Sequence, residues 1–396
     1  MDVRERPRSI WKQIDLLLIL ITLALLGYSM LLVYSATLGP GERWPQVNSW
    51  VLRHGLYAVL GFGAMIFLMR VDYRLHRTLA YGYYGVALVL LLLVLVAGHG
   101  AEEYGAQRWL SVGPFPFQPS EPAKLALLLA LATQLSTREE TPPSLRKVLV
   151  SLLLLLPAVG LVYLQPDLGT TITMVSIWIG LLFLSGTRAR ILLSGAVATV
   201  AAAPVVWLIL HDYMRQRILI YLNPESDPFR LGYNILQARI SIGAGGLLGR
   251  GLTSGTQTQL HYLRVQHTDF IFSVLAEELG FVGCVCLFLL YIMLVFRLIR
   301  AAQRARDAFG YLVACGFASL ILAQSLMNIG ANLTVLPVAG VPLPFISYGG
   351  SALITNLATL GIVQNIVRHE KRRRERAARR HRACDTGHRA YPRGAL

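Results

Sequence analysis

An acidic residue stands at the start of a long apolar segment, where its side chain can act at a membrane surface. Residues 267–272 read His-Thr-Asp-Phe-Ile-Phe. Thr268 or Asp269 can cap the helix that follows, and a capping position also fixes a side chain in place. An exposed Asp has a pKa of about 3.9, and partial burial raises that value. We therefore take Asp269 as the candidate base, with His267 and Thr268 as candidate substrate contacts.

Two further acids follow within the same apolar segment. Glu277 and Glu278 lie eight and nine residues beyond Asp269, roughly 12–14 Å deeper along a helix. Acids at membrane depth are functional candidates by default. On a regular helix Glu277 lies about 80° and Glu278 about 180° from Asp269, so both cannot face one site. We take Glu277 as a candidate substrate contact, although either acid can instead hold a neighbouring helix through an ion pair.

A second polar constellation combines two cations with an acid and an aromatic ring. Arg108 and Trp109 precede a segment in which Ser120 is a predicted N-cap, followed by Glu121 and Lys124. Arg108 and Lys124 can bind a phosphate on the outer surface. Residues three apart share a helix face, so Glu121 and Lys124 can equally form a local ion pair. Trp109 can be a substrate contact or an interfacial aromatic anchor.

Two segments rich in glycine complete the set. Residues 243–251 contain five glycines, whose amide N–H groups can cradle a diphosphate; a re-entrant turn or hinge explains the same spacing. Residues 341–351 are rich in Pro and Gly and contain Ser347, a further candidate substrate contact. Irregular backbone at membrane depth survives only inside protein or beside a wet cavity. We interpret 341–351 as a re-entrant element beside a site.

Composition indicates what must position these residues. The chain has 396 residues, 55% hydrophobic and 15% charged, whereas a soluble domain carries about 25% charged residues. A membrane-spanning helix needs about 20 apolar residues. The candidate spans are 14–35, 51–69, 79–98, 121–135, 147–164, 168–186, 191–210, 270–296, 308–329 and 350–367. The sequence therefore predicts an all-α polytopic membrane protein of about ten transmembrane helices.

Charge predicts the orientation of these spans. If the N-terminus is cytoplasmic, the inner segments are 1–13, 70–78, 136–147, 187–190, 297–307 and 368–396, which hold most of the 37 lysines and arginines. This is the positive-inside pattern. We expect a single domain with a cytoplasmic N-terminus (1–13), a transmembrane core (14–367) with a long outer loop (211–268) between helices 7 and 8, and a basic cytoplasmic tail (368–396).

Other classes of protein fit less well. The net charge of +16 reflects topology, and anionic inner-leaflet lipid attracts the basic tail, so we expect no nucleic-acid partner. The four cysteines show neither a disulfide framework nor metal-ligand spacing. The sequence identifies no cofactor, and it leaves open whether a divalent cation is required.

The motifs together resemble the SEDS family of RodA, FtsW and SpoVE over nearly the whole chain. The most specific segments are 108–109 with 117–124, 165–170, 227–228 with 232–233, 267–280 and 342–351. Segments 340–345 and 255–257 look more like RodA than FtsW. The chain departs from the family at Asn234, where Gln is common, and at 264–266, where a Pro-Glu pair is common.

The resemblance implies a peptidoglycan glycosyltransferase of the bacterial cytoplasmic membrane. Its substrate would be lipid II, an undecaprenyl-diphosphate-linked disaccharide peptide, polymerised into glycan strands at the outer face during cell elongation. The family's essential aspartate falls on Asp269. The expected partners are lipid II, the nascent glycan strand and a class B penicillin-binding protein, a transpeptidase.

Three alternatives stay open at this point. A lipid II flippase would also need many helices and intramembrane acids, but the inverted repeat of transporters is not evident in the sequence. A scaffold for the transpeptidase would have no activity of its own. An FtsW-type division enzyme would share the chemistry. Replacement of Asp269 by Asn separates the enzyme from the first two, because neither flipping nor complex formation needs this base.

Overall fold

The computed structural model describes residues 13–38, 48–99, 107–112, 115–137, 142–210, 212–227, 231–263 and 265–389. Residues 1–12 of the predicted N-terminal segment and residues 390–396 of the predicted tail lie outside the described residues. So do Pro228 and Arg264. Each of the ten predicted spans coincides with a helix. They are α1 (Leu16–Thr37), α2 (Ser49–Arg70), α3 (Tyr73–Ala97), α5 (Ser120–Leu135), α6 (Leu145–Leu164), α7 (Leu168–Leu184), α8 (Ala189–Ile209), α12 (Ile271–Gln303), α13 (Ala308–Asn332) and α14 (Gly350–Arg389).

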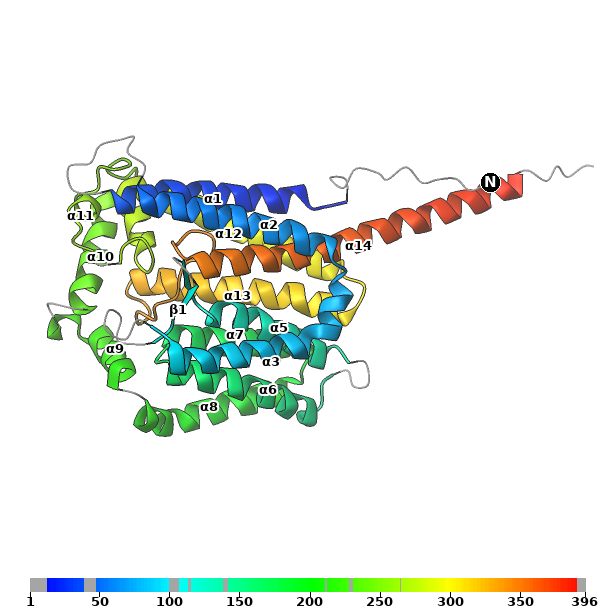
Figure 1. Cartoon of the computed structure of the whole chain (residues 1–396), viewed down its shortest axis with the longest axis horizontal. Helices are drawn as coiled ribbons and strands as arrows, with labels where there is room; N and C mark the ends of the chain where they lie inside the picture. The colour runs from blue at the N-terminus through cyan, green and yellow to red at the C-terminus, as the bar shows by residue number, and fades with distance from the viewer. Residues whose placement is uncertain are drawn as a thin grey trace, which may run out of the picture.

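The helices lie side by side in one bundle (Figure 1), and many of their large apolar side chains are exposed on its surface. Within the described residues, seven helices are long and apolar enough to cross a membrane, while α7 and the described part of α8 are shorter apolar helices. Helix α5 has only 16 residues and is buried along most of its length. Neighbouring protein rather than lipid covers it, which explains why a short helix suffices. The all-α polytopic membrane fold is confirmed.

Helices α2 and α14 approach each other closely through small residues. A Cβ on Gly61 would lie 2.5 Å from Cδ1 of Leu357, and a Cβ on Gly361 would lie 2.5 Å from the carbonyl oxygen of Met65. Such contacts between small residues are what let helices associate in lipid, where burial of apolar surface from water gives no driving force. They hold the first turns of α14 beside the second half of α2.

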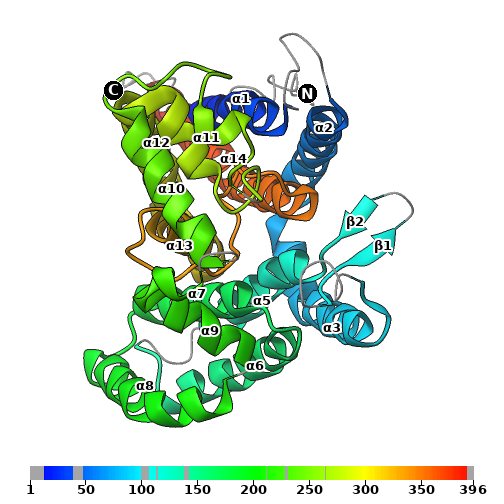
Figure 2. The same ribbon diagram turned by 90° about the vertical axis from the view of Figure 1, so that its left-hand side faces the viewer.

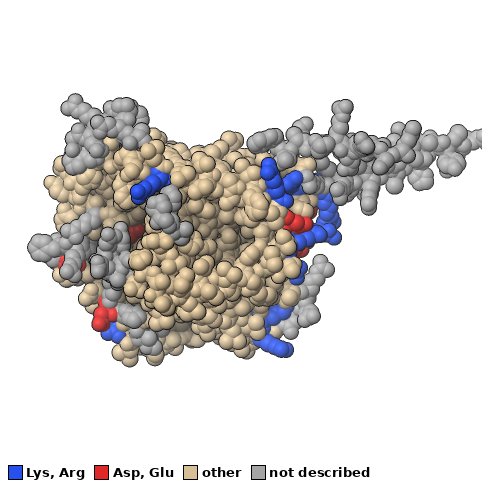
Figure 3. Space-filling view, viewed as in Figure 1, with Lys and Arg blue, Asp and Glu red and all other residues tan. Residues whose placement is uncertain are grey.

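The two ends of the bundle differ in charge. Helix α1 starts and α14 leaves the bundle at one end, and the visible Lys and Arg side chains gather there (Figures 1 and 3). We call this the basic end. Asp15 caps α1 and pairs with Arg297 of α12, and Gln364 of α14 bonds the backbone of Asp15. Ionic and hydrogen-bonded contacts therefore join α1, α12 and α14 at the basic end.

The opposite end carries the elements between the spans (Figure 2). The predicted long loop 211–268 is largely structured as α9 (Asp212–Leu222), the 3-10 turn η2 (Pro224–Ser226), α10 (Leu231–Gly245) and α11 (Thr256–Gln259). A two-stranded antiparallel hairpin, β1 (Leu110–Val112) and β2 (Phe115–Phe117), pairs Leu110 with Phe117. We call this end the loop end.

Helix α12 is broken at Gly280, whose φ is +64°. The break exposes backbone groups, and the glycine segment 243–251 satisfies them. Arg250 N and Gly251 N donate to the carbonyls of Glu277 and Glu278, at 3.0 and 2.9 Å, while Phe281 N donates to Gly246 O at 2.9 Å. Amides of this segment therefore serve the helix, which favours the re-entrant turn over the diphosphate cradle.

Candidate active site

Asp269 lies directly before α12, and two side-chain amides of α13 hold its backbone. Asn328 Nδ2 and Asn332 Nδ2 donate to the carbonyl of Asp269, at 3.0 and 2.9 Å. Asn332 Oδ1 in turn accepts from the amide and hydroxyl of Ser273, at 3.2 and 2.6 Å. Both asparagines are buried, so these bonds resist exchange with water and fix where the Asp269 backbone lies.

The irregular segment 341–349 is bonded to the residues just before Asp269. Ser347 Oγ donates to the carbonyl of Thr268 at 2.6 Å, and Tyr348 N donates to the carbonyl of His267 at 2.9 Å. Ser347 Oγ also accepts from Leu343 N at 2.8 Å. Its hydroxyl is thus engaged with protein on both sides, so the structure favours a positioning role over the predicted substrate contact.

An arginine from the loop end lies beside the Asp269 carboxylate. A Cβ placed on Gly340 would lie 3.4 Å from Nη1 of Arg217 and 3.8 Å from Oδ2 of Asp269. Arg217 comes from α9, and its Nη1 donates to Val338 O at 3.1 Å. Gly340 has a φ of +70°, a conformation that glycine adopts readily. The small residue therefore leaves room for the carboxylate and the guanidinium to approach.

The predicted cation Arg108 reaches the same region from the segment before the hairpin. Its Nε donates to Gln165 O at 3.2 Å, its Nη2 bonds Pro166 O, and its Nη1 lies 4.0 Å from Oδ1 of Asp167. Asp167 caps α7, because its carboxylate accepts from the amide and hydroxyl of Thr170. Arg108 and Asp167 both act electrostatically on Asp269.

These surroundings change the basicity of the carboxyl. Burial raises the pKa of Asp269, and Asp167 adds to that effect, while Arg217, the hydrogen bond from Thr268 and Arg108 oppose it. Removal from water outweighs the cations, so Asp269 holds a proton more tightly than an exposed Asp does. Burial also lowers the pKa of His267, which keeps its imidazole neutral near pH 7. The arrangement places a base beside cations.

Two other predicted site residues form a separate pair inside the bundle. Lys124 Nζ lies 2.8 Å from Oε1 of Glu121, and the side chains are 3% and 2% exposed. The prediction that Lys124 lies at the outer surface therefore differs from the structure. The spacing of three residues on one helix makes the pair, and helix packing buries it. Trp109 bridges His99 through the backbone and lies beside Arg108, partly buried.

Glu277 is likewise occupied by protein. Its buried carboxylate accepts from Gln257 N at 2.8 Å, and from Thr258 N and Oγ1 at 3.0 and 2.8 Å. An acid at a helix N-terminus satisfies donors that have no partner within the helix. Glu277 thus caps α11, away from Asp269, while Glu278 accepts from Ser35 of α1 at 2.5 Å. These contacts favour a structural role for both acids.

Sequence reasoning missed three polar residues that surround Asp269. Asn328 and Asn332 are four residues apart in an apolar segment, a spacing that places them on one helix face and that offered a signal. Arg217 gave no comparable signal, because only the fold brings α9 to Asp269. Among the described residues, no group of three or more His, Cys, Asp or Glu side chains gathers closely enough to hold a metal ion.

The comparisons with known proteins agree with this site. The family model described as "Cell cycle protein", for FtsW, RodA and SpoVE, matches residues 16–372. The chain is 42% identical over 377 residues to the peptidoglycan glycosyltransferase MrdB of Escherichia coli strain K12, which covers 94% of this chain and 98% of that protein. The chain therefore belongs to the FtsW, RodA and SpoVE family.

Solved structures show the same fold. A chain of a structure described as "Structural coordination of polymerization and crosslinking by a peptidoglycan synthase complex" matches with a TM-score of 0.77 and 36% identity, covering 90% of this chain and 98% of that one. The rod shape determining protein RodA of Thermus thermophilus matches with a TM-score of 0.68 and 33% identity, covering 91% and 98%.

Proposed function

We propose that this protein is a peptidoglycan glycosyltransferase of the elongation type, which polymerises lipid II into glycan strands. The observation that carries the proposal is the Asp269 carboxylate beside Arg217, with burial raising the pKa of the acid. A base next to a cation suits transfer of a sugar from a diphosphate. The similar protein MrdB of Escherichia coli is likewise named a peptidoglycan glycosyltransferase.

The reaction needs one proton acceptor and charge stabilisation for one leaving group. A saccharide hydroxyl attacks the anomeric carbon of the donor, a C–O bond forms, and the bond from that carbon to the lipid diphosphate breaks. Asp269 takes the hydroxyl proton as general base, a role worth about 10²–10⁴-fold in rate. Arg217 and Arg108 stabilise the negative charge that develops on the diphosphate. A divalent cation, if the reaction uses one, would bind the phosphate oxygens of the substrate.

The charge distribution supports the orientation. Lys and Arg gather at the basic end of the bundle (Figure 3), where the positive-inside rule puts the cytoplasm. Asp269 and the loop-end elements then face outward from the bacterial cytoplasmic membrane, and both termini are cytoplasmic. Lipid II presented on the outer leaflet would meet Asp269 with its diphosphate at the membrane surface.

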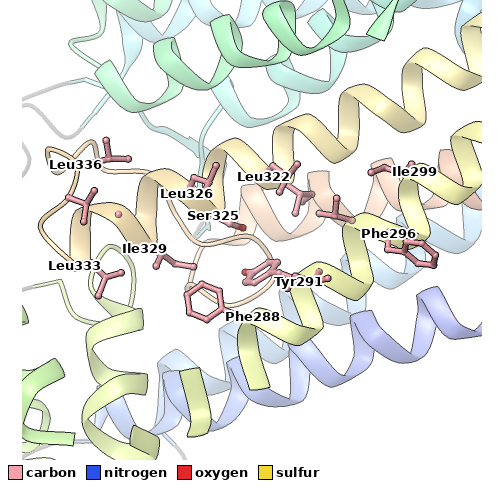
Figure 4. Close-up of a pocket in the computed structure, with 15 residues that line it drawn as sticks. Phe288, Tyr291, Phe296, Ile299, Leu322, Ser325, Leu326, Ile329, Leu333 and Leu336 are labelled. Carbon is pink, nitrogen blue, oxygen red and sulfur yellow. The ribbon is translucent and has the colours of Figure 1, made fainter. Parts of the chain in front are cut away.

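A surface groove supports partnership with a class B penicillin-binding protein. Helices α12 and α13 border an apolar groove of about 790 Å³, with Phe288, Tyr291, Leu326 and Leu336 among its lining side chains (Figure 4). An apolar transmembrane helix of a transpeptidase can pack against such a surface. One of the solved structures similar to this chain is of a peptidoglycan synthase complex that couples polymerisation to crosslinking.

Purified protein, supplied with labelled lipid II and with the partner present or absent, tests the proposal. We expect glycan strands from the wild-type complex. Translocation of lipid II in liposomes without polymer formation would instead favour a flippase. If the protein shows neither activity, the result favours a scaffold.

A further inference from the structure

Three rings from distant parts of the chain gather next to the catalytic segment. The ring centroids of Trp50 and His267 are 4.9 Å apart, those of Trp50 and Tyr348 are 5.1 Å apart, and those of His267 and Tyr348 are 5.6 Å apart. Each ring therefore contacts both others. His267 is two residues before Asp269, so the cluster is built on the segment that carries the candidate base.

The backbone and a buried histidine hold this cluster in place. Tyr348 N donates to the carbonyl of His267 at 2.9 Å. Behind the rings, Ser29 Oγ donates to Ile346 O at 2.6 Å and lies 2.7 Å from His54 Nε2. Because the only hydroxyl proton of Ser29 goes to Ile346, His54 Nε2 is the donor in the second bond. The ring centroids of His54 and Tyr348 are 5.7 Å apart, so the buried histidine packs against the cluster and positions it before any ligand arrives.

Part of the cluster stays open. Trp50 is 40% exposed although it touches two other rings. An exposed indole held by neighbouring rings keeps a large apolar face available at little cost in side-chain entropy. Burial raises the pKa of Tyr348 to about 12, and a hydrogen bond with Tyr57 adds to that effect, so the phenol keeps its proton and its ring is held in place.

We propose that Trp50, His267 and Tyr348 form a carbohydrate-binding platform that holds the acceptor saccharide beside Asp269. The inference rests on the proposed function and adds a site for one of the two substrates. Pyranose rings present C–H groups on their faces, which pack on aromatic rings, while their hydroxyl and acetamido groups use polar atoms nearby. Arg53, which acts on Tyr348, suits the carboxylates of the stem peptide.

The surroundings of Asp269 separate acceptor from donor. The guanidinium groups of Arg217 and Arg108 come from α9 and from the segment before the hairpin, and suit the lipid diphosphate that leaves the donor. The rings come from α2 and from segment 341–349. Two different sets of elements therefore converge on residues 267–269. The cationic set suits the departing diphosphate, and the aromatic set suits the sugar ring that carries the attacking hydroxyl.

Binding of a lipid-free glycan tests the platform apart from polymerisation. The probe is a soluble tetrasaccharide of alternating N-acetylglucosamine and N-acetylmuramic acid, titrated into the full-length protein by calorimetry. We expect Trp50→Ala and Trp50→Leu to weaken binding about fivefold to tenfold, as loss of an aromatic contact does, and Trp50→Phe to recover part of it. The matched control is Trp207→Ala, which removes a similarly exposed indole (37%) from α8.

Equal affinity of the wild type and Trp50→Leu for the tetrasaccharide, or no saturable binding by the wild type, would overturn the platform and leave Trp50 as an interfacial anchor. Trp50→Leu keeps an apolar side chain in the membrane interface, so a folding defect is not expected. Polymerisation of lipid II by the same wild-type preparation is measured separately. Its absence would count against the proposed function, whereas unchanged saccharide binding in the variants counts against the platform alone.

Discussion

Asn332 of α13 donates a hydrogen bond of 2.9 Å to the backbone carbonyl of Asp269. The same amide accepts from Ser273 in the first turn of α12. One buried side chain thus joins the end of one span to the start of another, and the proposed catalytic carboxylate lies at the junction. The position of Asp269 therefore depends on helix packing as well as on its own segment.

Replacement of Asn332 by Asp tests this positioning. Asp can still accept from Ser273 but, when ionised, cannot donate to Asp269, whose carbonyl keeps only the bond from Asn328. Loss of one hydrogen bond costs about 0.5–1.5 kcal/mol. We expect kcat to fall at least about tenfold, as small displacements of a catalytic group do, with little change in the KM for lipid II.

The matched control is Asn365→Asp at the basic end. Asn365 accepts from Tyr73 N at 2.9 Å and donates to Met69 O at 2.8 Å, so its replacement removes a comparable donor far from Asp269. Similar loss of thermal stability with unchanged kcat is expected there. If both variants lose activity in proportion to stability, Asn332 has no special link to catalysis.

Removal of the Arg217 charge should change the pH dependence of polymerisation. Arg217 opposes the burial that raises the pKa of Asp269, so Arg217→Met raises that pKa further. Since only the ionised base is active, the acidic limb of the kcat/KM profile should move to higher pH. Arg217→Lys, which keeps a charge but loses the planar fork, should move it less. A limb that does not move, or that moves to lower pH, contradicts the contact.

The buried pair of Glu121 and Lys124 should contribute strongly to the thermal stability of the protein. Removal of one partner leaves an uncompensated buried charge, at a cost of about 3–5 kcal/mol. We expect Lys124→Met to lower the midpoint of thermal unfolding strongly, and Glu121→Gln combined with Lys124→Met to recover much of it. Lys124→Arg should be milder than Lys124→Met. If the double variant unfolds like the wild type yet makes no glycan, the result would instead support the predicted contact between Lys124 and a phosphate.

Topology can be tested with a single cysteine at Glu225, which lies in η2 at the loop end. The background lacks Cys284, Cys286, Cys315 and Cys384. A membrane-impermeant maleimide should label Glu225→Cys from outside intact cells, because the positive-inside rule puts the basic end in the cytoplasm. Labelling only after the cells are opened would invert the orientation and move Asp269 to the wrong side for outer-leaflet lipid II.

Local patterns made the spans and the motif around Asp269 predictable, and long-range contacts limited the rest. An apolar run of about 20 residues identifies a span regardless of its neighbours. In contrast, α9 to α11 lie in a polar connection with no single period, and Glu277 caps a helix whose start is 21 residues earlier in the chain. Arg217, Trp50 and Tyr348 reach the site only through packing between distant elements, which no spacing along the chain encodes.

Asp269 is the proposed base for glycan polymerisation. The direct measurement is the rate of glycan-strand formation from labelled lipid II by well-folded Asp269→Asn protein in complex with the proposed transpeptidase partner. Asn keeps the size of the side chain and the ability to cap a helix but does not take up a proton. We expect a loss of about 10²–10⁴-fold, normal partner binding, and slight residual activity in Asp269→Glu. Polymerisation by Asp269→Asn at near wild-type rates would contradict the assignment.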